Sequence, residues 1–404
     1  MAQGIDSSAL YQQYDRMKML KAFDDTKAGV KGLCDSGLFQ LPQIFVRPPE
    51  ELAAELKHKK GQVQVPVIDL SGVDDCGRRK QIVEKVRSAA ETWGFFQVVS
   101  HGIPQSVCDG MIDGVRCFHE QDVDEKKKYY TRDTTKSVRY QSSYDLFLSK
   151  TATWKDTLTI SCDSSFDRDE LPSVCRDSIV EYSEHEENLG NILLGLLSEA
   201  LGLSTDFLGK MECSKGHRLH CHYYPACPEP ELAIGTGKHS DAGFLTILLQ
   251  NQLVCGLQVL CGGQWIDIEP VEGALVVNIG DLLQVSKEML QTTFLLGIQI
   301  QNFSYFMLLM EQLVSNGKLR SNEHRAIANR MGPRISVACF FSGPIDERGK
   351  IYGPIEELIT KQNPAVYKGV AMGDYVMNFL ATGMEDYRAL DYYKIQPSFE
   401  MYPL

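Results

Sequence analysis

The chain has 404 residues, of which 43% are hydrophobic and 23% charged, the mix of a globular protein with a sizeable core. A net charge of −12 and a pI of about 5.3 argue against a generally basic, nucleic-acid-binding surface. The 12 cysteines form no CxxC pair and no basic-then-apolar leader opens the chain, so we expect reduced thiols and a cytoplasmic location.

The first half of the chain mixes predicted helices with a few short strands. Residues 1–62 form an N-terminal extension rich in helix formers, and residues 63–175 follow as a second region. Apolar residues recur every three or four positions in residues 77–94, which predicts an amphipathic helix with a glycine at its end. We interpret the lysines at 126–128 as a solvated helix face and His119 as a surface residue.

After residue 217 the pattern changes to short β-rich runs separated by turns. Many short strands of this kind are typical of a β-sandwich or barrel. The sequence therefore predicts a β-centred core over residues 215–345, with a helical C-terminal region at 346–404. No repeat or low-complexity tract appears, so we expect one large α+β catalytic domain with helical cover rather than two independent modules.

A histidine and an aspartate two positions apart, His239 and Asp241, are the first candidates for chemistry. On an extended segment, residues i and i+2 point to the same face, which places an imidazole beside a carboxylate. One more histidine would complete the two-histidine, one-carboxylate face of non-haem Fe(II) oxygenases, which leaves coordination positions open. The pair alone is a weak signal because it is frequent by chance, and a merely structural histidine is the alternative.

A second pair with the same spacing, Arg334 and Ser336, follows His324 by ten and twelve residues. A planar guanidinium beside a hydroxyl suits bidentate binding of a carboxylate. A cosubstrate with two carboxylates could then chelate a metal with one end and bind Arg334 with the other. The alternative is an ordinary surface arginine–serine pair.

Longer segments carry a more specific resemblance. They include "VPVIDLSG", "AAETWGFFQVVSHGIP", "CHYYPACPEPELAIGTGKHSDAGFLTILLQ", "GALVVNIGDLLQ" and "EHRAIANRMGPRISVACFF". In these segments the chain resembles plant 2-oxoglutarate- and Fe(II)-dependent dioxygenases, in the branch of deacetoxyvindoline 4-hydroxylase and the 1-aminocyclopropane-1-carboxylate oxidase homologs. The similarity covers nearly the whole chain. It implies a double-stranded β-helix core, a jelly-roll of two facing sheets.

The same resemblance implies roles for individual residues. Three residues would bind Fe(II): His239, Asp241 and His324. Three more would bind 2-oxoglutarate: Arg334, Ser336 and Tyr224. Phe340 matches a position that often packs against substrate, whereas His222 stands where the family often has asparagine, so we assign His222 no role.

The implied reaction consumes 2-oxoglutarate and O2 at Fe(II), with ascorbate in support, and releases succinate and CO2 while a small specialised metabolite is hydroxylated or otherwise oxidised. We expect a monomer with a small-molecule substrate and with no nucleic-acid or membrane partner. Two alternatives stay open. One is an ethylene-forming enzyme of the 1-aminocyclopropane-1-carboxylate oxidase type, which needs ascorbate rather than 2-oxoglutarate. The other is a catalytically impaired product.

Residues 285–312 depart from the family pattern. In relatives of this branch, a segment like "NIGDLLQ" leads directly into one like "LVSNGKLRSNEHR", whereas here 28 residues separate the two. Removing them shortens the spacing between Asp241 and His324 from 82 intervening residues to 54, close to the family spacing. The insert corresponds to 84 nucleotides; its first codon, for Val285, begins with GT, and its last, for Gln312, can end in AG, as a plant intron does.

We therefore interpret the insert as a retained intron or a gene-model error, with a genuine loop or helix as the alternative. Its uncharged run from Met289 to Met310 contains seven polar side chains, so we do not expect a membrane span. The insert either leaves the domain as a surface excursion, which costs little closure entropy, or displaces the strand that carries His324 together with Arg334. The second case would remove the metal and cosubstrate sites.

Overall fold

The computed structural model describes residues 7–55, 64–162, 167–251, 254–284, 318–344, 350–360, 365, 367–382, 392–393 and 395. The predicted insert at 285–312, with its uncharged run, therefore lies outside the described residues. Within the described part of the chain, no helix is long and apolar enough to cross a bilayer.

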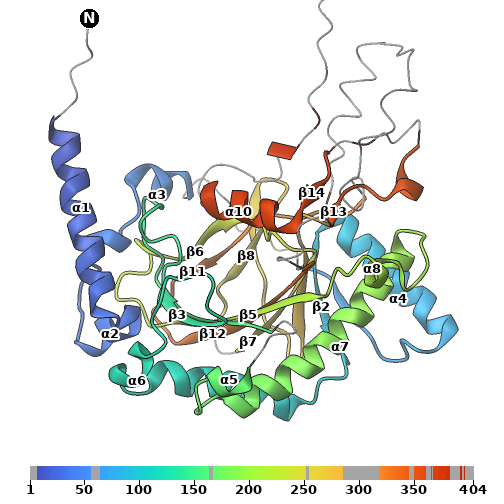
Figure 1. Cartoon of the computed structure of the whole chain (residues 1–404), viewed down its shortest axis with the longest axis horizontal. Helices are drawn as coiled ribbons and strands as arrows, with labels where there is room; N and C mark the ends of the chain where they lie inside the picture. The colour runs from blue at the N-terminus through green and yellow to red at the C-terminus, as the bar shows by residue number, and fades with distance from the viewer. Residues whose placement is uncertain are drawn as a thin grey trace, which may run out of the picture.

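Two sheets form the centre of the molecule (Figure 1). The major sheet has eight strands, in the order β1 (Val67–Asp69), β2 (Phe95–Val99), β10 (Leu275–Ile279), β7 (Leu245–Gln250), β12 (Arg334–Ser342), β5 (Gly216–Tyr224), β4 (Asp156–Ser161) and β3 (Val138–Ser142). The minor sheet has four, in the order β6 (Ile234–His239), β11 (His324–Ile327), β8 (Leu257–Cys261) and β9 (Gln264–Asp267). Together with the helices before and after them, they confirm the predicted α+β jelly-roll.

The two faces of strand β5 lie in different environments, one in the hydrophobic core and one on the cavity between the sheets. Side chains alternate between the two faces of a strand. Leu219 and Cys221 are therefore buried in the main hydrophobic core, under the covering helices. Arg218 and His220 lie on the opposite face and line a cavity between the two sheets.

Helices α4 (Cys76–Thr92), α5 (Gln105–Glu120) and α7 (Arg176–Ala200) share this core and cover the outer side of the major sheet (Figure 1). The predicted helix at 77–94 is thus confirmed as α4. Its N-terminus is capped by Asp75, whose carboxylate accepts hydrogen bonds from two backbone N–H groups of the first turn. Its end is marked by Gly94 at a φ of +60°, where a Cβ would overlap the Arg320 carbonyl oxygen.

Ser321, which follows the insert, lies beside Gln284, the last described residue before it. Ser321 donates its backbone N–H to the side-chain oxygen of Gln284, and Arg320 donates its N–H to the Ala90 carbonyl at 2.9 Å. Strand β11 then pairs with β6 and β8, so His324 keeps its place in the minor sheet. The alternative in which the insert displaces this strand is wrong.

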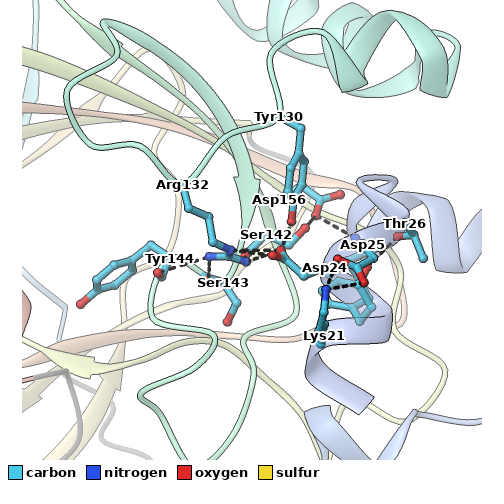
Figure 2. Close-up of polar contacts among 12 residues, drawn as sticks. Lys21, Asp24, Asp25, Thr26, Tyr130, Arg132, Ser142, Ser143, Tyr144 and Asp156 are labelled. Carbon is cyan, nitrogen blue, oxygen red and sulfur yellow. Dashed lines mark hydrogen bonds and ion pairs between the residues drawn. The ribbon is translucent and has the colours of Figure 1, made fainter. Parts of the chain in front are cut away.

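The N-terminal extension packs on the edge of the major sheet around a second apolar cluster, which includes Phe45 and Trp154. Its helices are α1 (Ser7–Thr26), α2 (Gly29–Asp35), η1 (Gln43–Phe45) and α3 (Pro49–Glu55). Polar contacts fasten it (Figure 2): Arg132 forms an ion pair with Asp24 at 2.8 Å and also donates to backbone carbonyls beyond β3. The Tyr130 hydroxyl donates to the same Asp24 carboxylate.

Asp156 is the central residue of this attachment and is labelled in Figure 2. Its carboxylate accepts from the backbone N–H groups of Val30 and Lys31, both at 2.8 Å, and from the Ser142 hydroxyl. Burial raises the pKa of Asp156, and these donors oppose that rise. The contact holds the start of β4 in place, and with it the preceding residue, Lys155, which lines the cavity.

Two surface assignments from the sequence are wrong. His119 is fully buried at the end of α5, stacked on the Tyr223 ring. Lys126 is also fully buried, because its ammonium donates to the His119 carbonyl oxygen at 2.7 Å instead of facing solvent. The C-terminal region contains helix α10 (Met372–Thr382), but also a short two-stranded sheet that the sequence did not predict, β13 (Ile351–Tyr352) with β14 (Val370–Ala371).

The remaining short helices are α6 (Val123–Lys127), η2 (Arg168–Glu170), α8 (Phe207–Lys210) and η3 (Glu356–Leu358).

Candidate metal centre

Three side chains with metal-binding atoms converge at one edge of the cavity. His239 ends β6, Asp241 lies two residues further on, and His324 begins β11 as the direct cross-strand partner of His239. Asp241 Oδ1 lies 3.6 Å from His239 Nε2 and 3.5 Å from His324 Nε2. Ligand atoms of all three lie within 4.8 Å of one another, so a single ion can contact them all.

Backbone contacts orient the two imidazoles. Nδ1 of His239 lies 2.8 Å from the Gly237 carbonyl oxygen, and Nδ1 of His324 lies 3.2 Å from the Asn322 carbonyl oxygen. A carbonyl oxygen can only accept, so Nδ1 carries the proton in each ring. Nε2 of each ring therefore presents its lone pair towards Asp241, as a metal-binding histidine requires.

The carboxylate of Asp241 is held by two donors from the major sheet. Thr246 Oγ1 and Asn278 Nδ2 donate to its Oδ2 at 2.6 and 2.7 Å, which leaves Oδ1 facing the imidazoles. Burial by itself would raise the pKa of Asp241, but the two histidines and these hydrogen bonds outweigh it and lower the pKa. Burial and the neighbouring His324 lower the pKa of His239 to about 3. Ionised carboxylate and neutral imidazole are the forms that bind metals.

Arg334, at the start of β12, forms a second charged site. It is 2% exposed, and it donates to Ser336 Oγ at 3.3 Å and to Gln250 Oε1 at 2.9 Å. Its guanidinium lies 5.0 Å from the centroid of the Tyr224 ring, and its Nε has no hydrogen-bond partner. In the described residues no carboxylate lies within ion-pair distance of this guanidinium, so a buried cation with an unsatisfied donor is available to an anion.

Both sites open into one cavity of about 760 Å³, a size typical of small-molecule sites. Its wall includes all seven residues singled out from the sequence: Tyr224, His239, Asp241, His324, Arg334, Ser336 and Phe340. The Phe340 ring lies 4.8 Å from the His220 ring, on the wall formed by β12 and β5. The two pairs that the sequence spacing singled out, His239–Asp241 and Arg334–Ser336, thus line the same cavity.

The register of the major sheet orders this wall in cross-strand rows. One row runs from the partners of Asp241 away from the metal centre: Asn278, Thr246, Phe340, Arg218 and Ser161. Another row belongs to the Arg334 site: Gln250, Ser336, His222 and Thr157. Neighbouring strands are about 4.8 Å apart, so Arg218 lies two strands, or about 10 Å, from Thr246.

A second group of ligand-type residues lies on the opposite face of the major sheet. Glu186 of α7, His217 of β5 and Cys339 of β12 also have ligand atoms within 4.8 Å of one another. All three are buried, and burial raises the pKa of Glu186 well above its ordinary value. The protonation states of this group differ from those of the cavity-facing one.

Comparison with known proteins matches both halves of the chain. Residues 65–177 match the family described as "non-haem dioxygenase in morphine synthesis N-terminal", and residues 215–295, which include His239 and Asp241, match the 2OG-Fe(II) oxygenase superfamily. "1-Aminocyclopropane-1-carboxylate oxidase homolog 1" of Arabidopsis thaliana is 44% identical over 385 residues, which cover 94% of this chain and 97% of the relative. The chain belongs to the 2OG-Fe(II) oxygenase superfamily.

Other relatives agree with this assignment and confirm the resemblance found in the sequence. Deacetoxyvindoline 4-hydroxylase of Catharanthus roseus is 43% identical over 396 residues, 96% of this oxygenase and 92% of the relative. A crystal structure of JOX2 in complex with 2OG, Fe and JA matches with a TM-score of 0.74 at 28% identity, over 91% of this chain and 98% of that one. A rice dioxygenase for auxin oxidation has the same fold, with a TM-score of 0.63 at 23% identity over 82% of this chain and 100% of that one.

The donor atoms of this oxygenase fit Fe(II), the metal of its family. Two imidazoles and one carboxylate converge from one side, and the remaining side opens into the cavity. This donor set with open positions is typical of non-haem Fe(II) oxygenases. The unsatisfied Nε of Arg334 fits the far carboxylate of 2-oxoglutarate, the family cosubstrate.

Sequence reasoning missed several polar residues of the oxygenase site. Thr246 and Asn278 were passed over as ordinary strand residues, although a polar side chain inside the apolar runs "FLTILLQ" and "ALVVNIG" is a usable signal. Lys155 was also missed: its ammonium donates to Thr236 Oγ1 at 2.9 Å, and the Tyr224 hydroxyl lies 3.1 Å from the same oxygen. Burial by itself would raise the pKa of Tyr224, but nearby cations, foremost Lys155, lower it.

Proposed function

We propose that this oxygenase hydroxylates or otherwise oxidises a small organic metabolite at Fe(II), with 2-oxoglutarate and O2 as cosubstrates and succinate and CO2 as co-products. The observation that carries the proposal is one cavity that joins a hydrogen-bonded Asp241, placed between two imidazoles, to a buried arginine with an unsatisfied donor. The family membership supports it.

Each residue has a definite task in this proposal. His239, Asp241 and His324 hold the metal, and the Thr246 and Asn278 donors keep Asp241 ionised so that it remains a ligand. When bound, iron and 2-oxoglutarate supply the activation of O2 that oxidises a substrate C–H bond. The chain positions these groups and the substrate against one another.

The cosubstrate site follows from the same geometry. Arg334 and the Ser336 hydroxyl offer the paired donors that a carboxylate accepts. Gln250 holds the guanidinium from the other side, and the Tyr224 ring lies against it. The burial of Arg334 excludes water from this contact, which strengthens a charge-assisted hydrogen bond.

The two alternatives from the sequence predict different behaviour. A 1-aminocyclopropane-1-carboxylate oxidase type would release ethylene from that amino acid with ascorbate and without 2-oxoglutarate. An impaired product would fail to retain iron. The assembled ligand set on β6 and β11 favours a competent enzyme over the impaired product.

The test is succinate formation from 2-oxoglutarate by the purified 404-residue chain in air with ascorbate. We expect slow substrate-free turnover that requires added Fe(II) and disappears in the Asp241→Ala variant. Ethylene formed from 1-aminocyclopropane-1-carboxylate in the absence of 2-oxoglutarate would favour the second enzyme class. Succinate formation that persists in Asp241→Ala, or is absent from the natural chain under all conditions, would contradict the proposal.

A further inference from the structure

The hydroxyl of Thr236 connects the two sheets on the wall of the cavity. Thr236 belongs to β6 of the minor sheet, three residues before His239. Two groups reach its Oγ1 from the side of the major sheet: the Lys155 ammonium, which donates to it at 2.9 Å, and the Tyr224 hydroxyl, whose oxygen lies 3.1 Å away. These three side chains are 5 to 6% exposed, so their contacts are shielded from bulk water, which strengthens a charge-assisted hydrogen bond.

The register of the major sheet places Lys155 next to Tyr224. Asp156, the residue after Lys155, is the cross-strand partner of Tyr223, and side chains alternate between the two faces of a strand. On the other side, Arg334 is the cross-strand partner of Tyr224. Burial by itself would raise the pKa of Tyr224, and the charge of Lys155 is the largest of the influences that lower it, ahead of Arg334. Tyr224 therefore lies between two cations that both line the cavity.

The protons of this contact have one order that satisfies every donor. An ammonium can only donate, so Lys155 occupies one lone pair of the Thr236 oxygen and leaves the Thr236 proton free to point elsewhere. Among the described residues, the Tyr224 oxygen is the acceptor within hydrogen-bond distance of that proton. With Thr236 as the donor, the Tyr224 proton is left for an acceptor in the cavity, where Arg334 offers an anion site.

We propose that Lys155 is a positioning residue for the cosubstrate, which acts through Thr236 to direct the Tyr224 hydroxyl proton towards the bound anion. That anion is the far carboxylate of 2-oxoglutarate at Arg334, so the inference rests on the proposed function and adds to its cosubstrate site. Lys155 does not need to touch the carboxylate, because it fixes the direction in which its neighbours donate. The hydrogen bonds that attach Asp156 to α2 hold the start of β4, and therefore also the position of Lys155.

The test is a double-mutant cycle on the dissociation constant of 2-oxoglutarate. The constant is measured anaerobically on the complete chain with Fe(II), by titration of the visible charge-transfer band. Tyr224→Phe should raise it about tenfold and Lys155→Met about fivefold, because a hydrogen bond to a charged group is worth a factor of about ten or more. In the Tyr224→Phe background, Lys155→Met should raise it less than about twofold, because the group that Lys155 directs is gone.

Two further variants act on the intermediate hydroxyl and do not depend on replacing a buried lysine. Thr236→Val keeps the side-chain shape but removes the hydroxyl, so it should weaken binding about as much as Lys155→Met. Thr236→Ser keeps the hydroxyl and should bind 2-oxoglutarate as the natural chain does. The matched control is Lys210→Met, which removes an exposed lysine of α8 that pairs with Asp206 and should leave the constant unchanged.

A second ligand separates positioning from a general effect on the fold. 2-Oxopentanoate carries a methyl group in place of the far carboxylate, so Lys155→Met should leave its dissociation constant unchanged. An equal loss for both ligands would overturn the inference, as would a Lys155→Met effect of the same size with and without the Tyr224 hydroxyl, or no effect at all. A natural chain that gives no band with 2-oxoglutarate would contradict the proposed function and this inference with it, whereas a band with uncoupled losses contradicts this inference alone.

Discussion

Two groups of three potential metal-ligand residues are similar in composition and equally compact, but the pKa of the carboxyl group is lowered in one and raised in the other. The cavity group is His239, Asp241 and His324, and the core group, between the major sheet and α7, is Glu186, His217 and Cys339. In the cavity group, the two histidines and, after them, two hydrogen-bond donors outweigh burial and lower the pKa of the carboxyl group. In the core group, burial raises the pKa of Glu186 and Cys339 and lowers that of His217 to about 4.

The difference shows that closeness alone does not make a metal site. The two histidines and, after them, the hydrogen bonds from Thr246 and Asn278 keep Asp241 ionised. The Glu186 oxygens, by contrast, lie beside the Tyr182 hydroxyl and the Cys339 thiol without a well-formed hydrogen bond. A metal at the core group would have to displace two protons in an apolar environment. We therefore expect iron at the cavity group and none at the core group.

The largest effect is expected from removing the charged ligand. Asp241→Asn keeps the shape of the side chain but removes the anionic oxygen between the two imidazoles. Loss of a residue that only orients a metal ligand lowers metal affinity by about 10- to 100-fold, so loss of the charged ligand itself should lower iron affinity by more than about 100-fold. Iron per chain after desalting is the measurement. Cys339→Ser, in the core group, is the matched control and should retain iron; iron loss from the control would contradict the comparison.

The next effect concerns the cosubstrate. Arg334→Gln removes the charged donors and should raise the KM for 2-oxoglutarate by about 10- to 100-fold, because a hydrogen bond to a charged group contributes about 1.5–3 kcal/mol and 1.4 kcal/mol is tenfold. Arg330→Gln is the control, since Arg330 is an exposed arginine four residues earlier that pairs with Glu231 at 3.0 Å. Equal KM values in both variants would refute the assignment of Arg334.

A smaller effect is expected from the group that orients Asp241. Thr246→Val keeps the side-chain shape and removes one of the two donors to Oδ2, so iron should bind about tenfold more weakly, the lower end for residues that orient metal ligands. The Fe(II) dissociation constant, measured anaerobically, decides. Unchanged affinity would mean that Asn278 alone keeps the carboxylate ionised and in place.

The smallest effect is on stability and concerns the core group. The raised pKa of folded Glu186 means that the unfolded chain loses this proton first as the pH rises, so stability falls above about pH 4.5 by about 1.4 kcal/mol for each unit of the shift. Glu186→Gln carries no titrating group, so it should raise the melting temperature at pH 8 by a few degrees relative to the natural chain and change it less at pH 5.

The control for this stability change is Glu187→Gln, on the exposed side of α7. It should leave the difference between pH 5 and pH 8 as it is in the natural chain. A Glu186→Gln variant that is less stable than the natural chain at pH 8 would show that Glu186 is ionised and paired in the fold, and the contrast between the two groups would fail.

The sequence predicts the positions of the main elements because hydrophobic periodicity is a local signal. Helix α4 and strands β5, β7, β10 and β12 all lie on segments with the predicted pattern. The burial of His119 and Lys126 could not be predicted in the same way. Lys126 belongs to a run of three lysines, and only the fold brings its ammonium to the His119 carbonyl oxygen.

The residues of the site also divide into those that a local sequence pattern reveals and those that only the fold brings together. The pairs His239–Asp241 and Arg334–Ser336 are visible as local spacings, but 82 residues separate His324 from Asp241, and His324 was identified through the family resemblance. The donors Thr246 and Asn278 reach Asp241 through strand pairing between β7 and β10, which no local pattern contains.

The most direct test of this account is an anaerobic absorption titration of the complete 404-residue chain with Fe(II) and 2-oxoglutarate, beside a variant that lacks residues 285–312. The account predicts a visible charge-transfer band from the complete chain, because β11 holds His324 in register and the ligands are assembled. The shortened chain should give the same band. A band from the shortened chain alone would show that the insert breaks the site and would contradict the account of this chain as a competent oxygenase.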